Sequence, residues 1–361
     1  MTASSTTSHV QTHFVYTAFP QRIVFGVGAL AKVTEELEGL GVSRAMILCT
    51  TEQRELAEMV AGSIGAKAVG IYDKAVMHVP MGIVADACEQ ANALGADSVI
   101  TVGGGSTTGL GKAIALTSVL PVLAIPTTYA GSEVTSIYGI TYSGEKTTGR
   151  NSRVLPRTVI YDPLLSVSLS PKSSAASGMN AIAHCVEAIY AKDANPITTM
   201  IAEEAIRALA ASLPEIVKDP HKLSARCSAL YGAWLAGTAL AAVSMGLHHK
   251  LCHVLGATFD LPHAETHTII LPYVARYNSN AAPEAMSRIA RAIGATDAPQ
   301  GLFDLVASLG LRTRLSQIGM PREGLVRAAR MASEAPYPNP EPVERDRVLA
   351  LLRSAFDGLP P

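Results

Sequence analysis

The chain has 361 residues with 29 lysines and arginines against 30 aspartates and glutamates, so its formal net charge is −1. This length suggests two domains, each large enough to bury its own core. The balanced charge favours neither nucleic acid nor an anionic membrane as a partner. The five cysteines are scattered without a CxxC pair, which fits a reduced, cytoplasmic protein without a disulfide framework.

Two segments could suggest export or membrane insertion. Residues 1–13 are polar and rich in serine and threonine, without the apolar centre of a secretion signal, and we expect a disordered tail. Residues 227–247 carry no charge, but alanine, glycine and serine dilute their hydrophobicity. A helix packed inside a bundle is therefore the prediction for this stretch, and no membrane is expected as a partner.

Residues 14–165 alternate between short β-rich runs and helical segments, which predicts a Rossmann-like α/β domain with parallel strands and crossover helices. An edge hairpin is expected from residues 13–17 and 22–25. The other expected strands cover 44–50, 66–72, 97–102 and 121–126, and the expected helices cover 52–64 and 83–94.

Residues 166–361 lack strand signals and carry long alanine- and leucine-rich segments at helical spacing, which predicts an all-helical domain. Ser170 and Pro171 form a good helix start, with serine as the cap and proline in the first turn. Further helices are expected over residues 196–213, 223–247, 282–293, 300–309 and 323–333.

The first chemical motif is a glycine-rich turn between a predicted strand and a predicted helix. Gly103, Gly104 and Gly105 let the backbone approach a ligand, and Ser106 opens a helix whose N–H groups can bind phosphate. The spacing matches neither GxGxxG nor a Walker sequence. A dinucleotide pyrophosphate is the expected ligand, and a turn without a ligand is the alternative.

Hydroxyl side chains follow two other strands of the same predicted sheet. Thr127 and Thr128 lie at the carboxyl end of a parallel strand, where ligands bind in open α/β sheets, although such pairs also serve turns and caps. Thr51 follows the first predicted strand of the alternating pattern, at the position where a carboxylate would bind the adenosine ribose 2′-hydroxyl. Without that charge to repel a 2′-phosphate, NADPH should be accepted as well as NADH, although Thr51 is also compatible with a plain helix cap.

Histidines dominate the helical half. His184, His249 and His263 could converge on one metal, and the fourth position, four residues before His184 on the same helical face, holds Asn180. An amide is a much weaker ligand than a carboxylate for a hard or borderline cation. We therefore expect a former metal site that now serves another use, with no metal bound.

These motifs together resemble a known superfamily over nearly the whole chain. The segments GGGS, IPTTYAGSEVT, NAIAHCVEA, HHKLCHVLG and LPHAETH occur in the order typical of the iron-containing (group III) alcohol dehydrogenases. Within that superfamily the chain most resembles the maleylacetate reductases. The features that carry this resemblance are Asn180, the doubled histidine before Lys250, residues 157–162 and residues 337–340. The resemblance implies a dehydroquinate synthase-like fold, with an N-terminal NAD(P)-binding domain and a helical substrate domain.

The resemblance also implies roles for individual residues. Gly103, Gly104, Gly105 and Ser106 would hold the pyrophosphate, and Thr127 and Thr128 would line the adenosine and nicotinamide side. Asn180, His184, His249 and His263 fall on the four metal-ligand positions, and His253 falls near the nicotinamide. Reductases of this type are expected to work without added metal, as homodimers, in the degradation of aromatic compounds.

The implied substrate, maleylacetate, is a dicarboxylate with an enone, and its expected product is 3-oxoadipate. Hydride transfer to the alkene carbon β to the ketone creates an enolate, which a cation or a preorganised donor can stabilise. His248, His249, Lys250 and His253 would supply up to four cations within six residues. On a helix His249 and His253 share one face, at i and i+4.

From this cluster we assign His253 as the proton donor and His249 and Lys250 as enolate stabilisers. Tyr337 is a further candidate donor, although a proline-flanked tyrosine is often a loop anchor. Lys146 could reach the nucleotide, with Arg150 competing for that role. Substrate binding is expected from Asn180, His184, His248 and His263 in a cleft between the domains.

Three alternatives remain open at this stage. The first is a metal-dependent NAD(P) alcohol or polyol dehydrogenase in which Asn180 serves as a weak fourth ligand. The second is a lyase or synthase that uses its nicotinamide only transiently, as dehydroquinate synthase does. The third is a nucleotide-binding regulator without turnover, against which the internal cluster of histidines and lysine argues.

Overall fold

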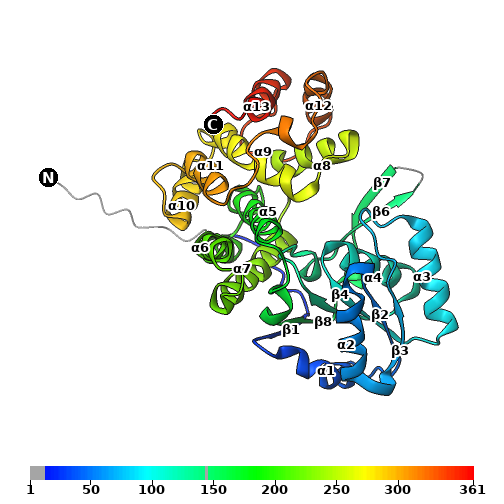
Figure 1. Cartoon of the computed structure of the whole chain (residues 1–361). Helices are drawn as coiled ribbons and strands as arrows, with labels where there is room; N and C mark the ends of the chain where they lie inside the picture. The colour runs from blue at the N-terminus through cyan, green and yellow to red at the C-terminus, as the bar shows by residue number, and fades with distance from the viewer. Residues whose placement is uncertain (1–12, 143–144) are drawn as a thin grey trace.

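The structure of the chain is a computed structural model that describes residues 13–142 and 145–361, except for the side chains of residues 145 and 146. The tail predicted for residues 1–13 therefore lies outside the described residues, apart from His13. The described chain has an α/β part built on a parallel sheet and a helical part packed beside it (Figure 1).

The N-terminal part is built on a six-stranded parallel sheet with the strand order β1-β8-β5-β4-β2-β3. The inner strands β2, β4, β5 and β8 are buried along their whole length, as expected for a parallel sheet covered on both faces. The strands are β1 (Arg22–Phe25), β2 (Ala45–Leu48), β3 (Ala68–Tyr72), β4 (Ser98–Gly103), β5 (Val122–Pro126) and β8 (Thr158–Tyr161). The helices are α1 (Val33–Gly39), α2 (Arg54–Ile64), α3 (Met81–Ala93) and α4 (Gly105–Ser118).

The predicted edge hairpin is wrong. Residues 14–18 form no strand, and β1 pairs in parallel with β8 in the register Arg22 to Thr158. The hairpin of the α/β part lies instead at β6 (Ile137–Tyr142) and β7 (Glu145–Arg150), which pair antiparallel away from the main sheet. Strand β7 has a polar sequence and β6 is only partly buried, so neither resembles an inner strand and the sequence pattern did not reveal them.

The C-terminal part is helical, and in the described residues after Tyr161 no strand occurs, as predicted. Ser170 caps the first helix as expected, accepting a hydrogen bond from the Ser173 N–H at 3.1 Å. This helix packs against the next two in the largest core cluster. The helices are α5 (Pro171–Tyr190), α6 (Pro196–Lys218), α7 (Leu223–Ala242), α8 (Leu247–Phe259), α9 (His263–Asn278), α10 (Pro283–Ile293), α11 (Ala298–Ser308), α12 (Gly324–Ser333) and α13 (Arg345–Asp357).

The single helix predicted over residues 223–247 is in fact broken. Helix α7 ends at Ala242, and α8 begins at Leu247 after a bend of 99°. No single helix of the described chain is long and apolar enough to cross a membrane, and α7 and α8 qualify by length and composition only as this bent pair. The break matters for function because it creates a new helix N-terminus directly before His248 and His249.

Candidate active site

The glycine turn has the geometry of a phosphate-binding loop. Strand β4 ends at Gly103, and Gly104 is the N-cap of α4, where no described side chain caps the helix. The first-turn N–H groups of α4 therefore remain available to an anion. A Cβ on Gly103 would lie 2.2 Å from Gln53 Oε1, and one on Gly104 would lie 3.0 Å from Thr128 Cγ2, so neighbouring loops pack tightly here.

The two threonines hold this loop in different ways. The Thr127 N–H donates to the Gly103 carbonyl at 3.1 Å, and the buried Thr127 hydroxyl accepts from Gln53 Nε2 at 2.7 Å. Thr128 is only half-buried and stands beside Gly104. Sequence reasoning missed Gln53, which joins the ends of three strands, because a glutamine two residues after a threonine gives no signal of its own.

Thr51 is exposed, and its hydroxyl donates to the Asp73 carbonyl at 3.1 Å. This is turn chemistry at the end of β3, and a role at the ribose stays a prediction. The structure adds a charged pair that the sequence did not suggest: the Asp73 carboxylate, beside Thr51, binds Arg54 NH1 at 2.9 Å.

Lys146 and Arg150 were the basic residues predicted to contact the nucleotide. Lys146 lies on β7, and its side chain is outside the described residues. Arg150 donates to the Ala241 and Val243 carbonyls at 2.7 and 2.9 Å, so it anchors the end of α7. Lys112, which follows the glycine motif, is fully buried and donates to Thr135 Oγ1 at 2.9 Å, so it points away from a phosphate.

The segment after β5 connects the glycine loop to the helical part. The Tyr129 N–H donates to Ser177 Oγ of α5 at 3.1 Å. A Cβ on Gly105 would lie 3.7 Å from Ala130, and one on Gly131 would lie 2.9 Å from the Gly237 Cα of α7. The glycine loop and the helix that carries Asn180 and His184 therefore meet at the boundary of the two parts.

Four buried side chains form a continuous hydrogen-bonded chain at this boundary. Asn180 Nδ2 lies 3.3 Å from His184 Nε2, and His184 Nδ1 lies 2.9 Å from His249 Nε2. His249 Nδ1 lies 2.6 Å from the carboxylate of Glu187. Because a carboxylate accepts, His249 donates from Nδ1, His184 donates to His249, and Asn180 donates to His184.

Glu187 is the functional residue that sequence reasoning missed. Its carboxylate also accepts from the N–H groups of Gly246, His248 and His249, at 3.0, 2.8 and 3.3 Å, and so caps the N-terminus of α8. Burial alone would raise the pKa of Glu187, but the bond from His249 and the nearby imidazoles and N–H groups lower this pKa to about 2. A glutamate three residues after His184, on a helix buried around its circumference, was the available signal.

Three buried histidines are not cations, and one of them, His248, belongs to the predicted cluster of four. Burial, together with the neighbouring imidazoles, lowers the pKa of His184 and of His267 well below the usual range. Burial and the neighbouring His249 likewise lower the pKa of His248 to about 3. These three imidazoles are therefore neutral near pH 7 and act as donors or acceptors only.

The predicted substrate contacts differ in exposure, and we call Lys250, His253 and His263 the basic rim. His253 and His263 are exposed and Lys250 is half-buried, whereas Asn180 and His184 are 6% and 4% exposed. The His253 ring centroid lies 6.2 Å from that of the buried His249. The prediction that His248 binds substrate is wrong, because α8 turns this side chain inward, where it is 0% exposed and lies 3.0 Å from His267.

Tyr337 is half-buried, and its hydroxyl donates to the Ala332 carbonyl at 2.8 Å. Burial and the charge of Glu187 raise the pKa of this phenol, which weakens it as a proton donor. The geometry favours the loop-anchor role, and a donor role stays a prediction that the geometry does not favour.

The predicted metal positions do not gather their donor atoms. Among the described histidines, cysteines, aspartates and glutamates, the one group of three with ligand atoms within 4.8 Å of one another is His248, Cys252 and His267. His184 and His249 turn their facing nitrogens toward each other, and the Asn180 Oδ1 has no hydrogen-bond partner in the described chain. A neutral amide with paired imidazoles makes a poor set for ferrous iron, which prefers a carboxylate.

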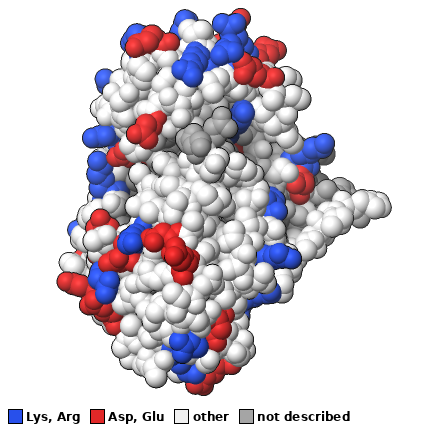
Figure 2. Space-filling view, turned by 90° about the vertical axis from the view of Figure 1, so that its right-hand side faces the viewer, with Lys and Arg blue, Asp and Glu red and all other residues white. Residues whose placement is uncertain are grey.

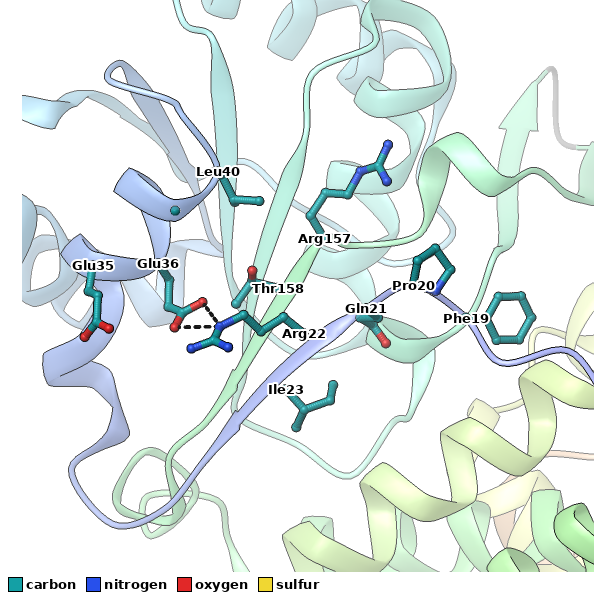
Figure 3. A pocket seen from close by; sticks show the side chains of 11 residues that line it. Phe19, Pro20, Gln21, Arg22, Ile23, Glu35, Glu36, Leu40, Arg157 and Thr158 are labelled. Carbon is teal, nitrogen blue, oxygen red and sulfur yellow. Dashed lines mark hydrogen bonds and ion pairs between the residues drawn. The ribbon is translucent and has the colours of Figure 1, made fainter.

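Two pockets lie away from the glycine loop. A pocket of about 840 Å³ opens at the amino ends of β1 and β8, where Arg22 pairs with Glu36 (Figure 3). Another, of about 1380 Å³, lies between α5, α10 and residues 338–340 and reaches Glu187. One face of the molecule shows scattered charges of both signs around a broad uncharged area, which agrees with the balanced composition (Figure 2).

Comparison with known proteins agrees with this architecture. The family model described as "Iron-containing alcohol dehydrogenase" matches residues 20–163, and "Fe-containing alcohol dehydrogenase family, C-terminal" matches residues 174–356. A maleylacetate reductase of Burkholderia cepacia is 56% identical over 96% of this chain and 99% of its own length.

Solved structures extend the comparison. The crystal structure of maleylacetate reductase from Agrobacterium tumefaciens has a TM-score of 0.95 and 48% identity, covering 97% of this chain and 100% of that one. A 1,3-propanediol oxidoreductase structure has a TM-score of 0.91 and 29% identity, covering 95% and 100% of the two chains. The resemblance inferred from the motifs is confirmed: the chain belongs to the iron-containing alcohol dehydrogenase family.

Proposed function

We propose that this chain reduces the carbon–carbon double bond of maleylacetate to form 3-oxoadipate, with NADH or NADPH as the hydride donor. The observation that carries the proposal is the 56% identity to a maleylacetate reductase over 96% of the chain. The site supports it through an uncapped helix N-terminus at the glycine loop and a boundary histidine cluster with an exposed basic rim.

The chemistry follows from the substrate and the rim. Bound NADH or NADPH would supply hydride at the alkene carbon β to the ketone, and negative charge would then develop on the ketone oxygen. Lys250 and His253 stabilise this enolate and bind the substrate carboxylates, and His253 then protonates the α carbon. His263, which is exposed at the start of α9, contributes to substrate binding.

The buried chain positions these groups. The hydrogen bond to Glu187 keeps the proton of His249 on Nδ1. His249 Nε2 is then an acceptor, and it accepts from His184 Nδ1. A direct role of His249 at the enolate requires the substrate to displace that bond. In the proposal His249 and His184 are therefore chiefly positioning residues, and Asn180 orients His184.

The family is named for iron, so membership in it does not support the expectation that this chain binds no metal. The donor set at Asn180, His184, His249 and His263 nevertheless does not fit iron in the described arrangement, and the proposed steps use none. Metal analysis of purified protein, with activity measured before and after chelation, tests this. One tightly bound metal per chain that is needed for activity would return the chain to the metal-dependent alcohol dehydrogenases.

The decisive assay follows NADH oxidation with maleylacetate, beside simple aldehydes. We expect turnover with maleylacetate and little with aldehydes; the reverse preference would support the alcohol dehydrogenase alternative. His253→Ala should lower turnover on the order of 10²-fold if this side chain supplies the proton. His221→Ala, an exposed histidine between α6 and α7, is the matched control and should leave turnover unchanged.

The two remaining alternatives are separated in the same experiment. A synthase that borrows hydride would consume no net NADH per product, and a regulator would bind nucleotide without turnover. We also propose a cytoplasmic homodimer and functional boundaries at residues 14–165 and 166–361. Phe25 on the edge strand β1 is exposed, and so are Phe14 and Val15 in the segment before it. These apolar side chains support an intersubunit contact, which light scattering of the purified chain would test.

A further inference from the structure

A second set of metal-binding side chains lies behind the histidine chain. His248 and Cys252 come from α8, His267 comes from α9, and the three are 0%, 2% and 0% exposed. Their ligand atoms lie within 4.8 Å of one another, which no other three histidines, cysteines, aspartates or glutamates of the described chain achieve. The set differs from the positions Asn180, His184, His249 and His263.

Helix geometry creates this arrangement. His248 and Cys252 are four residues apart, so they lie on one face of α8, and α9 packs against that face. His248 Nε2 lies 3.0 Å from His267 Nδ1 and 3.7 Å from Cys252 Sγ. Zinc bonds of about 2.0–2.3 Å to nitrogen and sulfur place tetrahedral ligands about 3.3–3.8 Å apart, so small side-chain movements suffice.

The hydrogen bonding of the set is incomplete. His248 Nδ1 and His267 Nε2 are buried without a hydrogen-bond partner among the described residues. These are the outer nitrogens of the two rings. An ion in the cluster would bind His248 Nε2 and His267 Nδ1, whose mutual contact of 3.0 Å it would replace, together with Cys252 Sγ.

We propose that His248, Cys252 and His267 bind a thiophilic divalent cation, zinc, which joins α8 to α9. A thiolate with two imidazoles suits zinc, whereas the neutral set around Asn180 offers no anion. As the metal–sulfur bond forms, the Cys252 thiol loses its proton to solvent and both imidazoles bind as neutral ligands, so no oxidant or reductant is required.

The position of the site gives it a structural consequence. Helix α8 carries His249, Lys250 and His253, and α9 begins with His263. A cation held between the two helices fixes the spacing of the rim on which the proposed chemistry depends. Zinc binding is measured by the cobalt band and maleylacetate reduction by NADH oxidation, so failure of the one proposal is distinguished from failure of the other.

The test uses cobalt as a spectroscopic substitute for zinc. The full chain is unfolded, stripped with a chelator and refolded with one equivalent of Co²⁺, which gives the buried site access to the ion. We expect a near-ultraviolet sulfur-to-cobalt charge-transfer band in the wild type and its loss in Cys252→Ser. Cys88→Ser, at a half-buried cysteine on α3, is the matched control and should keep the band.

Further outcomes decide the identity of the site. His184→Ala should retain the band, since His184 belongs to the other set, whereas His267→Gln should weaken cobalt binding at least tenfold. No band in the wild type, or a band that survives Cys252→Ser, overturns the proposal. If the Cys252 variants do not fold, X-ray absorption of the zinc-refolded wild type decides: one sulfur and two imidazole ligands support the site, and any shell without sulfur rejects it.

Discussion

Replacing Glu187 with glutamine should destabilise the chain far more than a one-atom change suggests. One carboxylate oxygen accepts from the Gly246 N–H at 3.0 Å and from His249 Nδ1 at 2.6 Å, and the other accepts from the His248 N–H at 2.8 Å. Glutamine has a single acceptor oxygen, so in either orientation its NH₂ group faces a buried donor. The negative charge at the N-terminus of α8 is lost as well.

These losses can be added from typical values. A buried donor left without an acceptor costs about 1–3 kcal/mol. The loss of a negative charge at a partly buried helix N-terminus costs about 1 kcal/mol more. We therefore expect Glu187→Gln to lower the free energy of unfolding by about 2–4 kcal/mol, measured by urea denaturation at neutral pH.

A functional effect should accompany the loss of stability. Without its carboxylate partner His249 loses its fixed orientation, and the loss of such a partner typically lowers activity about 10- to 100-fold. The matched control is Glu203→Gln, whose carboxylate pairs with Arg288 and Arg291 near the surface and should matter by less than about 1 kcal/mol. A Glu187→Gln enzyme as stable and as active as this control would refute the capping and positioning roles.

Four further changes test the site. Gly104→Val places a branched side chain at the glycine loop and should raise the cofactor KM at least tenfold, while Gly62→Val, with open space around it, should not; equal KM values would remove the phosphate-loop assignment. Thr51→Asp should shift selectivity toward NADH by repelling a 2′-phosphate, and unchanged NADPH kinetics would place Thr51 elsewhere. Asn180→Asp puts a carboxylate where the Asn180 amide now lies 3.3 Å from His184 Nε2, and it should increase metal uptake without improving maleylacetate reduction, checked by metal analysis beside the NADH assay. His248 has a pKa of about 3 when folded against about 6.5 when unfolded, so the unfolding free energy should decrease as pH falls between these values, less steeply in His248→Gln; equal slopes would contradict its burial.

The sequence by itself determined the order of the fold and the cofactor loop. Strand–helix alternation up to residue 165 predicted the parallel sheet, and the glycine triplet after a buried strand predicted the uncapped N-terminus of α4. These features are local, since periodicity and backbone freedom act over a few residues. Ser170 and Pro171 marked the start of α5 for the same reason.

Only the tertiary structure decided which histidines meet substrate and which are buried. His248 and His249 are neighbours in sequence, yet His248 packs against α9 and His249 bonds to a glutamate 62 residues earlier. The bend between α7 and α8 orients them, and the carboxylate of Glu187 on another helix caps the start of α8. Contacts between distant segments set burial, and burial lowers the pKa of His248 to about 3, so spacing along the chain could indicate the cluster but could not assign its charges.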